Sequence, residues 1–244
     1  NAGNSIASGG NYNVVVGDEA GTALTTGDNN VAIGYAALAT EDADGENTAV
    51  GYGTLQNQNA GVTAQNVAIG HNAGNDITTG IRNTLIGGSA GDVLTDADFN
   101  TAVGQQALTT DTLGSNSTAI GYGALGTQNF TTATDSYNTA VGSLAGTAVT
   151  TGTDNTIVGG LAGDAATTAS GITLLGKSAG SAITTGGDNT GIGKQALENT
   201  TTGTFNTAVG KDALESNTEG GDNVAIGYNA LTADTLGSRS TALG

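Results

Sequence analysis

The stretch Asn30-Val31-Ala32-Ile33-Gly34 is one copy of a five-residue phrase that recurs along the whole chain. Each copy ends on a glycine, called here the anchor glycine, and fourteen anchors occur in 244 residues. The anchors are Gly17, Gly34, Gly51, Gly70, Gly87, Gly104, Gly121, Gly142, Gly159, Gly176, Gly193, Gly210, Gly227 and Gly244. Eleven of the thirteen intervals are 17 residues, and the other two are 19 and 21. Such a strict period predicts a fold made by stacking one coil on the next.

The residue directly before each anchor is always Val, Ile or Leu, which indicates a short strand. Alternation along that strand puts this aliphatic residue and the Thr or Val two places earlier on one face, and a small residue, usually Ala, on the other. Both faces are small or apolar, so we expect both to be covered. We predict that the aliphatic column is the structural core: Val16, Ile33, Val50, Ile69, Ile86, Val103, Ile120, Val141, Val158, Leu175, Ile192, Val209, Ile226 and Leu243. The Ala face would then be free to pack against a second chain.

Asparagine stands four residues before the anchor in most copies. Stacked coils place these side chains above one another, which predicts a ladder in which each amide donates to the next. The ladder residues are Asn13, Asn30, Asn47, Asn66, Asn83, Asn100, Asn138, Asn155, Asn189, Asn206 and Asn223; Ser117, Ile172 and Ser240 take this place in the other copies.

The rest of the coil carries a second apolar stretch, with Ala usually three and Leu or Gly four residues after the anchor, followed by a glycine turn. Two short strands and two turns per 17 residues predict an all-β chain, a parallel β-solenoid of about 14 coils. Helix is disfavoured because glycine falls too often. We expect one array over residues 1–244, with longer loops inserted within 52–70 and 122–142, and a section of a longer fibre.

Composition excludes several function classes. The formal charge is −17, which disfavours nucleic acid as a partner because phosphate binding needs clustered Lys and Arg. Cysteine is absent, which excludes disulfides and thiolate metal sites. No apolar run is long enough for insertion into a membrane. His71 is the only histidine and no phosphate-loop motif occurs, so we expect neither enzyme activity nor a cofactor.

The phrases Asn30–Gly34, Asn66–Gly70 and Asn223–Gly227 read Asn-Val-Ala-Ile-Gly. They resemble the head repeats of trimeric autotransporter adhesins, and similar arrays occur in tail fibres of bacterial viruses. The resemblance covers almost the whole chain. It implies a left-handed β-roll, a homotrimeric rod and a place outside the cell, on a cell or virion surface. The implied function is a structural or adhesive fibre segment that spaces or presents elements binding a glycan or protein receptor. The present repeat is three residues longer than the adhesin repeat.

The residue directly after the anchor is the most varied of its turn, which indicates exposure. We call this position the first turn column. Its candidate surface contacts are Tyr35, Tyr52, Tyr122, Tyr228, Lys177, Lys194 and Lys211, joined by Phe130 from the longer insertion. The tyrosines could bind sugar faces or seal a seam between chains. The lysines could bind acidic glycans or form a solvated row partly neutralised by neighbours such as Asp212.

Three weaker interpretations remain open from the sequence. Asp42, Asp44 and Glu46 could offer oxygen ligands to Ca²⁺, although they do not form a full calcium-loop motif. The regular Thr column could bind ice, but it shares a face with the aliphatic column and is expected to be buried. The ends of a parallel stack could also join into a filament.

Overall fold

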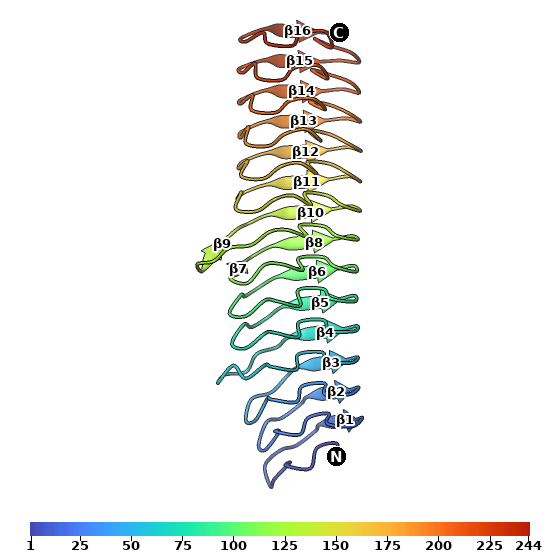
Figure 1. Ribbon diagram of the computed structural model, residues 1–244, viewed down its shortest axis with the longest axis vertical. Coiled ribbons are helices and arrows are strands. Elements are labelled where there is room, and N and C mark those ends of the chain that lie inside the picture. Colours follow the sequence, from blue (N-terminus) through green and yellow to red (C-terminus); the bar gives the residue numbers. More distant parts are fainter. The chain divides into compact units, whose positions relative to one another are not determined.

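The computed structural model describes residues 1–244 and divides into two compact units. The first unit comprises Asn1–Ser117 with Asn129–Asp135, and the second comprises Thr118–Gln128 with Ser136–Gly244. Both are built from the same coil, which carries one short strand and a series of turns (Figure 1). The predicted all-β, parallel β-solenoid of about 14 coils with a 17-residue repeat is confirmed.

Every strand of the main sheet in each unit is three residues long and parallel to its neighbours. In the first unit these strands are β1 (Val14–Val16), β2 (Val31–Ile33), β3 (Thr48–Val50), β4 (Val67–Ile69), β5 (Thr84–Ile86) and β6 (Thr101–Val103). In the second unit they are β8 (Thr118–Ile120), β10 (Thr139–Val141), β11 (Thr156–Val158), β12 (Thr173–Leu175), β13 (Thr190–Ile192), β14 (Thr207–Val209), β15 (Val224–Ile226) and β16 (Thr241–Leu243). The two-residue strands β7 (Gly114–Ser115) and β9 (Thr134–Asp135) pair separately in the first unit.

The register of the sheets follows the anchor glycines. Val14 pairs with Val31, one repeat further along the chain. Pairing resumes in the same register across both longer intervals, Thr48 with Val67 and Thr118 with Thr139. The extra residues of each insertion therefore leave the stacking of the strands unchanged.

The prediction of two strands per coil is wrong. The apolar stretch after the anchor is a series of turns, because its residues repeatedly adopt the left-handed backbone region. Leu38, Leu55 and Leu108, each four residues after an anchor, have φ of 50°, 48° and 52°. A strand requires a strongly negative φ, so these leucines enter the core from tight turns.

The predicted orientation of the strand is also wrong, because the Ala face and not the aliphatic face fills the coil. Ala32, Ala49 and Ala68 are fully buried, whereas Ile33 and Leu175 on the opposite face are 36% and 48% exposed. The interior also receives the side chains of the turns, such as Leu38. Where a turn leucine enters the interior, the inner strand position holds Ala or Gly; where Gly replaces that leucine, the inner position can be large, as at Leu85, Ile157 and Leu174.

The interior of each coil is filled in one of two ways. Where Leu stands four residues after the anchor, the residue three places later is polar, as in Leu38 and Glu41. Where Gly stands there, the later residue is apolar and occupies the vacant space: a Cβ added to Gly180 would lie 2.7 Å from Cδ1 of Ile183. The first kind includes Leu38/Glu41, Leu55/Gln58, Leu108/Asp111, Leu125/Gln128, Leu197/Thr200, Leu214/Asn217 and Leu231/Asp234; the second includes Gly21/Leu24, Gly74/Ile77, Gly91/Leu94, Gly146/Val149, Gly163/Ala166 and Gly180/Ile183.

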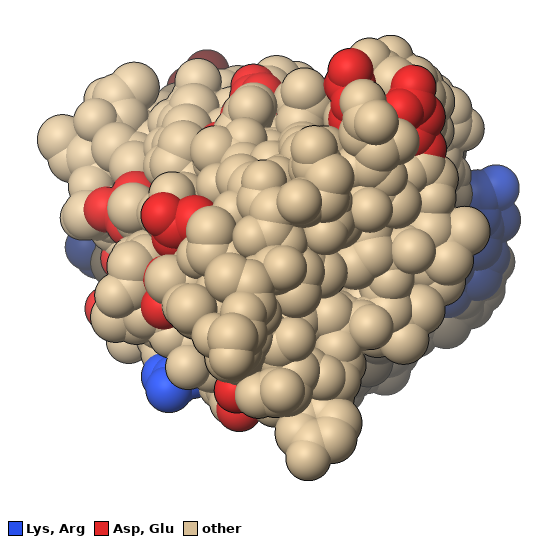
Figure 2. Space-filling model, turned by 90° about the horizontal axis from the view of Figure 1, so that it is seen from below, with Lys and Arg blue, Asp and Glu red and all other residues tan.

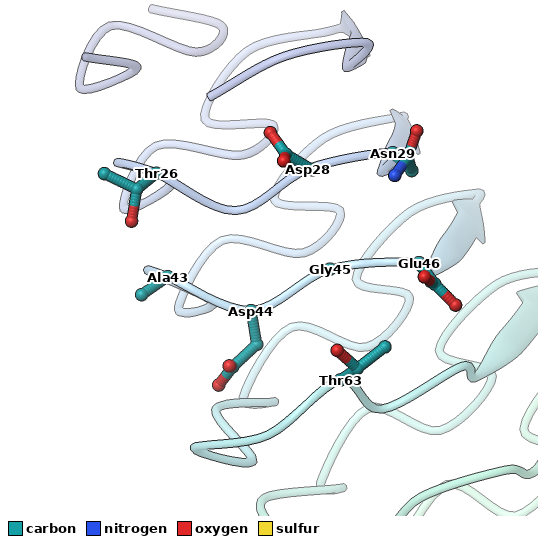
Figure 3. A pocket seen from close by; sticks show the side chains of 8 residues that line it. All are labelled: Thr26, Asp28, Asn29, Ala43, Asp44, Gly45, Glu46 and Thr63. Carbon is teal, nitrogen blue, oxygen red and sulfur yellow. The ribbon is translucent and has the colours of Figure 1, made fainter. Parts of the chain in front are cut away.

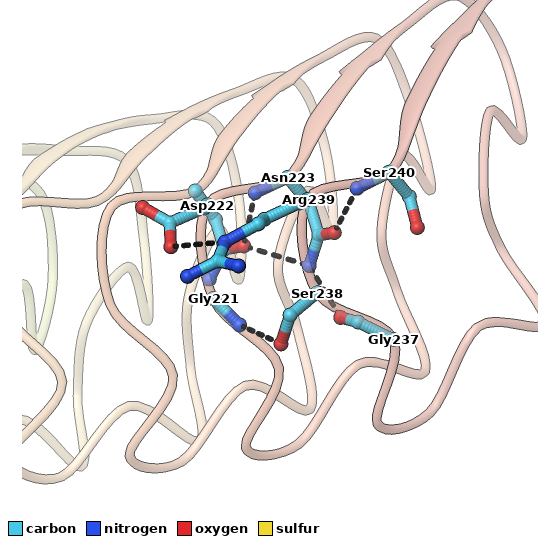
Figure 4. Close-up of polar contacts among 8 residues, drawn as sticks. Gly221, Asp222, Asn223, Gly237, Ser238, Arg239 and Ser240 are labelled. Atoms are coloured by element: carbon cyan, nitrogen blue, oxygen red, sulfur yellow. Dashed lines mark hydrogen bonds and ion pairs between the residues drawn. The ribbon is translucent and has the colours of Figure 1, made fainter.

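The asparagine ladder joins side chains to backbone. Oδ1 of Asn83 accepts a hydrogen bond from the N–H of Asn100 at 2.9 Å, and its Nδ2 donates to the carbonyl of Ala97 at 2.8 Å. Figure 4 shows the same pair of bonds from Asn223, to the N–H of Ser240 and the carbonyl of Gly237. Within the ladder, only Asn223 also donates to the amide of its predecessor, Asn206. The predicted chain of amide-to-amide bonds is therefore wrong: the asparagine side chain before one strand binds a turn carbonyl and the backbone N–H before the strand of the next coil.

Buried glutamines adjust the ladder at the two insertions. Oε1 of Gln58 accepts a hydrogen bond from Nδ2 of Asn66 at 2.9 Å, and Oε1 of Gln128 does the same for Asn138 at 2.9 Å. Nδ2 of Asn47, whose usual carbonyl partner would lie in the first insertion, has no hydrogen bond. The first insertion therefore removes one hydrogen bond from the ladder, the one that Nδ2 of Asn47 would otherwise donate.

Candidate functional site

The outward face of each main sheet is an uncharged strip two side chains wide. The first and third residues of the strands point outward and are half-buried or exposed, and none of these strands contains a charged residue. The predicted core column lies on this strip, which we call the outer face. Its Thr residues are half-buried or exposed, so the expectation that the Thr column is buried is wrong. An exposed, regular, apolar strip of this kind typically marks an interaction surface.

Three side chains of the first turn column form a continuous stack in the first unit. The rings of Tyr35 and Tyr52 lie 5.1 Å apart at 21°, and those of Tyr52 and His71 lie 5.1 Å apart at 7°. A hydrogen bond to the Glu19 carboxylate raises the pKa of the Tyr35 hydroxyl. The faces of Tyr52 are covered by its neighbours, so a sugar cannot stack on that ring. His71 belongs to this stack, although it was not among the candidate surface contacts. Its position directly after an anchor glycine, like that of Tyr35 and Tyr52, could have indicated this.

The lysine row of the second unit is exposed, and it is neutralised at one end. Lys211 forms an ion pair with Asp212, which raises the pKa of the amine, and its Nζ lies 5.1 Å from the ring centre of Tyr228. Lys177 and Lys194 are exposed and make no ion pair. Tyr122 is about half exposed.

Phe130 is not a surface contact. Only 6% of it is exposed, its N–H donates to Oδ1 of the buried Asp111 at 3.0 Å, and its carbonyl accepts from Leu113. Cδ2 of its ring lies 2.7 Å from the place where Gly114 would carry a Cβ. The ring folds back onto the coil because burying it removes a large apolar area from water.

The acidic candidates separate into two places. A carboxylate of the buried Glu41 lies with those of Asp42 and Asp44, their oxygens all within 4.8 Å of one another. Glu46 instead lines a neighbouring hollow of ≈ 230 Å³ with Asp28 and Asp44 (Figure 3). The sequence interpretation missed Glu41; the signal was its place in the interior position that the coil fills with Leu, Ile or a polar residue.

Glu41 is held by hydrogen bonds from Nε2 of Gln58 at 3.2 Å and from the N–H of Asp44 at 3.3 Å. Burial raises its pKa to about 7, and the negative charge of Asp44 adds to this effect. A carboxyl with a pKa of about 7 is only partly ionised at neutral pH, which weakens it as a calcium ligand because the ligand is the carboxylate.

We predict that Glu41→Gln stabilises the protein at pH 8 and leaves its stability at pH 4 unchanged. The raised pKa means that the Glu41 contribution is fully present below about 4.5, the ordinary value, and is lost as pH rises through about 7. The expected gain at pH 8 is on the order of 2 kcal/mol, less than the full shift would give because the loop carrying Asp42 is open to solvent. Urea denaturation at the two pH values measures it. Glu46→Gln is the control, and an equal gain at both pH values would contradict the assignment.

Neither the distribution of surface charge nor comparison with known proteins points to a further site. Acidic groups lie in several separate places on the visible face of Figure 2, among a majority of uncharged atoms. The structure has no helix that is long and apolar enough to cross a membrane. Comparison of the chain with protein-family models, curated proteins and solved structures gives no match.

Proposed function

We propose that the chain is a structural segment of a surface fibre, in which the outer face packs against further copies of the same chain. The observation that carries this proposal is the uniformity of that face: aliphatic and Thr or Val side chains repeat on every strand, while the exposed first turn column varies freely. The chain has a net charge of −17, so a strip without any charged residue can pack against another copy without electrostatic repulsion. The fibre would space or present elements that bind a receptor outside the cell.

The area of the face is sufficient for a specific interface. The second unit alone presents eight strands, each with two outward side chains. If each buries roughly 50 Å², one copy contributes roughly 800 Å², the size typical of a stable partner surface. The thin interior, filled largely by Ala and Leu, favours the same arrangement because covering the outer face would add a second apolar core. Two or three copies could close around such a face, and the resemblance of the repeat to trimeric adhesin heads favours three.

The experiment is to place a charge on the outer face. Leu175 is 48% exposed, so Leu175→Lys should leave the coil folded. A buried ammonium without a partner would oppose packing between copies, and we expect the variant to sediment as a single chain at micromolar concentration. Glu219→Lys, an exposed change away from the face, is the control and should assemble like the wild type. Association of Leu175→Lys equal to that of the wild type would rule the face out. Growth of the wild type without a limiting mass would favour the filament alternative.

Ice binding is a second candidate because the Thr column is open to solvent. In the second unit Thr118, Thr139, Thr156, Thr173, Thr190 and Thr207 stand on successive strands of the outer face. Their spacing of about 4.8 Å gives a regular row of hydroxyl and methyl groups. Thermal hysteresis at micromolar protein would favour this function over self-association, and its absence would exclude it.

A further inference from the structure

A gap interrupts the first turn column directly after the aromatic stack. Tyr35, Tyr52 and His71 fill this column in three successive coils, and Gly88 takes the next place. A Cβ added to Gly88 would meet no atom closer than Cγ of Gln105, at 3.9 Å. One face of the His71 imidazole covers Tyr52, and on its other side the next place in the column is a glycine, bordered by Cγ of Gln105.

The height of this gap suits one ring. Successive coils of a parallel stack rise by about 4.8 Å, so His71 and Gln105 stand roughly 10 Å apart along the column. The rings already stacked in this column are 5.1 Å apart. A ring lying over Gly88 would continue the stack at the same distance, in contact with the imidazole on one side and the Gln105 side chain on the other. Backbone hydrogen bonds hold the three turns in register, from the N–H of Ser89 to the carbonyl of His71 and from the N–H of Gln106 to the carbonyl of Gly88.

The two turn positions that flank the gap carry polar, uncharged side chains. Ser89 is half-buried, and Gln105 and Gln106 are exposed, so a hydroxyl and two amides are near the gap as donors and acceptors. No Lys, Arg, Asp or Glu occurs in the two turn positions of these three coils, in contrast to the Lys211 and Asp212 pair of the second unit. A purely aromatic guest would leave these polar groups without partners, whereas an anion or cation would find no opposite charge.

We propose that the gap over Gly88, between His71 and Gln105, binds a neutral hexopyranose ring. The apolar face of the sugar stacks on the imidazole, and its hydroxyl groups exchange hydrogen bonds with the side-chain amides of Gln105 and Gln106. This proposal rests on the proposed function and names a ligand class for the receptor-binding elements of the fibre. Self-association of the outer face is measured by mass and does not depend on the sugar site, so either can fail without the other.

The test uses His71, the only histidine, as its own probe. The methyl glycosides of glucose, galactose and mannose are titrated at fixed pH while the carbon-bound imidazole protons are followed by NMR. We expect saturable shifts with at least one of the three, with a dissociation constant on the order of 1–10 mM, as for a small ligand on one shallow site. The absence of saturable shifts up to ten times that concentration with all three would overturn the proposal.

Filling the gap provides the decisive variant. Gly88→Tyr places a ring over the imidazole, where the open space should admit it, and should weaken sugar binding at least tenfold. Gly160→Tyr is the matched control: it lies in the same column, its Cβ would meet only the carbonyl oxygen of Ser143 at 3.8 Å, and it has no aromatic neighbour to stack on. It should bind sugar like the wild type. His71→Ala, followed by saturation transfer to the sugar, should weaken binding to the same degree as Gly88→Tyr; unchanged affinity in either variant would contradict the site.

Discussion

Replacing Gly142 with Ala is expected to destabilise the protein by on the order of 4 kcal/mol, which would remove much of the stability of an ordinary domain. Gly142 has φ of +139°, a region that is closed to residues with a Cβ. An added Cβ would also lie 2.7 Å from the carbonyl carbon and oxygen of Gly159 in the next coil. The backbone cannot yield without opening the strand pairing beside it, so strain and collision add to one another.

Gly160→Ala provides the matched control for this prediction. Its site has no positive φ, and its Cβ would meet only the carbonyl oxygen of Ser143, at 3.8 Å. We expect a change within about 0.5 kcal/mol, as for substitutions that neither strain the backbone nor meet a close neighbour. Urea denaturation of both variants at equal protein concentration compares them directly, since association would otherwise contribute to apparent stability. Equal stability of the two variants would contradict the close contact between the anchor glycines Gly142 and Gly159.

Asn83→Ala is expected to cost roughly 3 kcal/mol, because the buried amide satisfies two backbone groups at once. Without it, the N–H of Asn100 and the carbonyl of Ala97 lose their partners in a site that excludes water. Each buried group left unpaired costs about 1–3 kcal/mol. Thermal or urea unfolding of the variant measures this loss.

Asn83→Asp separates the two hydrogen bonds. Its carboxylate still accepts from the N–H of Asn100 but cannot donate to the carbonyl of Ala97 and repels it. A protonated carboxyl can donate, so the variant should regain stability as the pH falls and the acid is protonated. A pH-independent loss equal to that of Asn83→Ala would mean that the donor half of the rung contributes nothing.

The register of the coils could be predicted from the sequence because the anchor glycine occurs once in every coil and stands at the same place in each. The Cβ that every other residue has would collide with the next coil at this point, so the phrase must repeat wherever coils stack. The pairing of Val14 with Val31 and of Thr118 with Thr139 follows directly. The positions of the ladder asparagines were predictable for the same reason. Their hydrogen-bond partners were not, because a side-chain amide stacked on the next asparagine also lies within reach of backbone groups of that coil.

The orientation of the strand could not be predicted from alternation alone. A three-residue strand with small or apolar residues on both faces fits either orientation, and the choice depends on what the rest of the coil brings inside. That choice is made by leucines such as Leu38 in the left-handed region, a conformation that propensity does not favour for Leu. Once they enter the interior, a small residue such as Ala32 fits beside them and Ile33 faces outward, whereas coils with Gly in place of the leucine admit Leu85, Ile157 or Leu174 on the inner face.

The candidate surface was predicted in part. The first turn column is exposed as expected, but the stacking of Tyr52 on His71 depends on both side chains choosing the same rotamer, which the sequence does not specify. Phe130 was misplaced because an insertion has no repeat to align it with. Glu41 was missed because the position seven residues after the anchor is polar in some coils and apolar in others, so the sequence does not mark it as interior; its partner Gln58 lies 17 residues later.

The most direct test of the account is the mass of the wild-type protein in solution, because the outer face should be covered by other copies. Sedimentation equilibrium from micromolar to tens of micromolar protein should give three times the chain mass of 23.5 kDa. A mass of one chain across this range would contradict the proposal that the outer face joins copies of the chain.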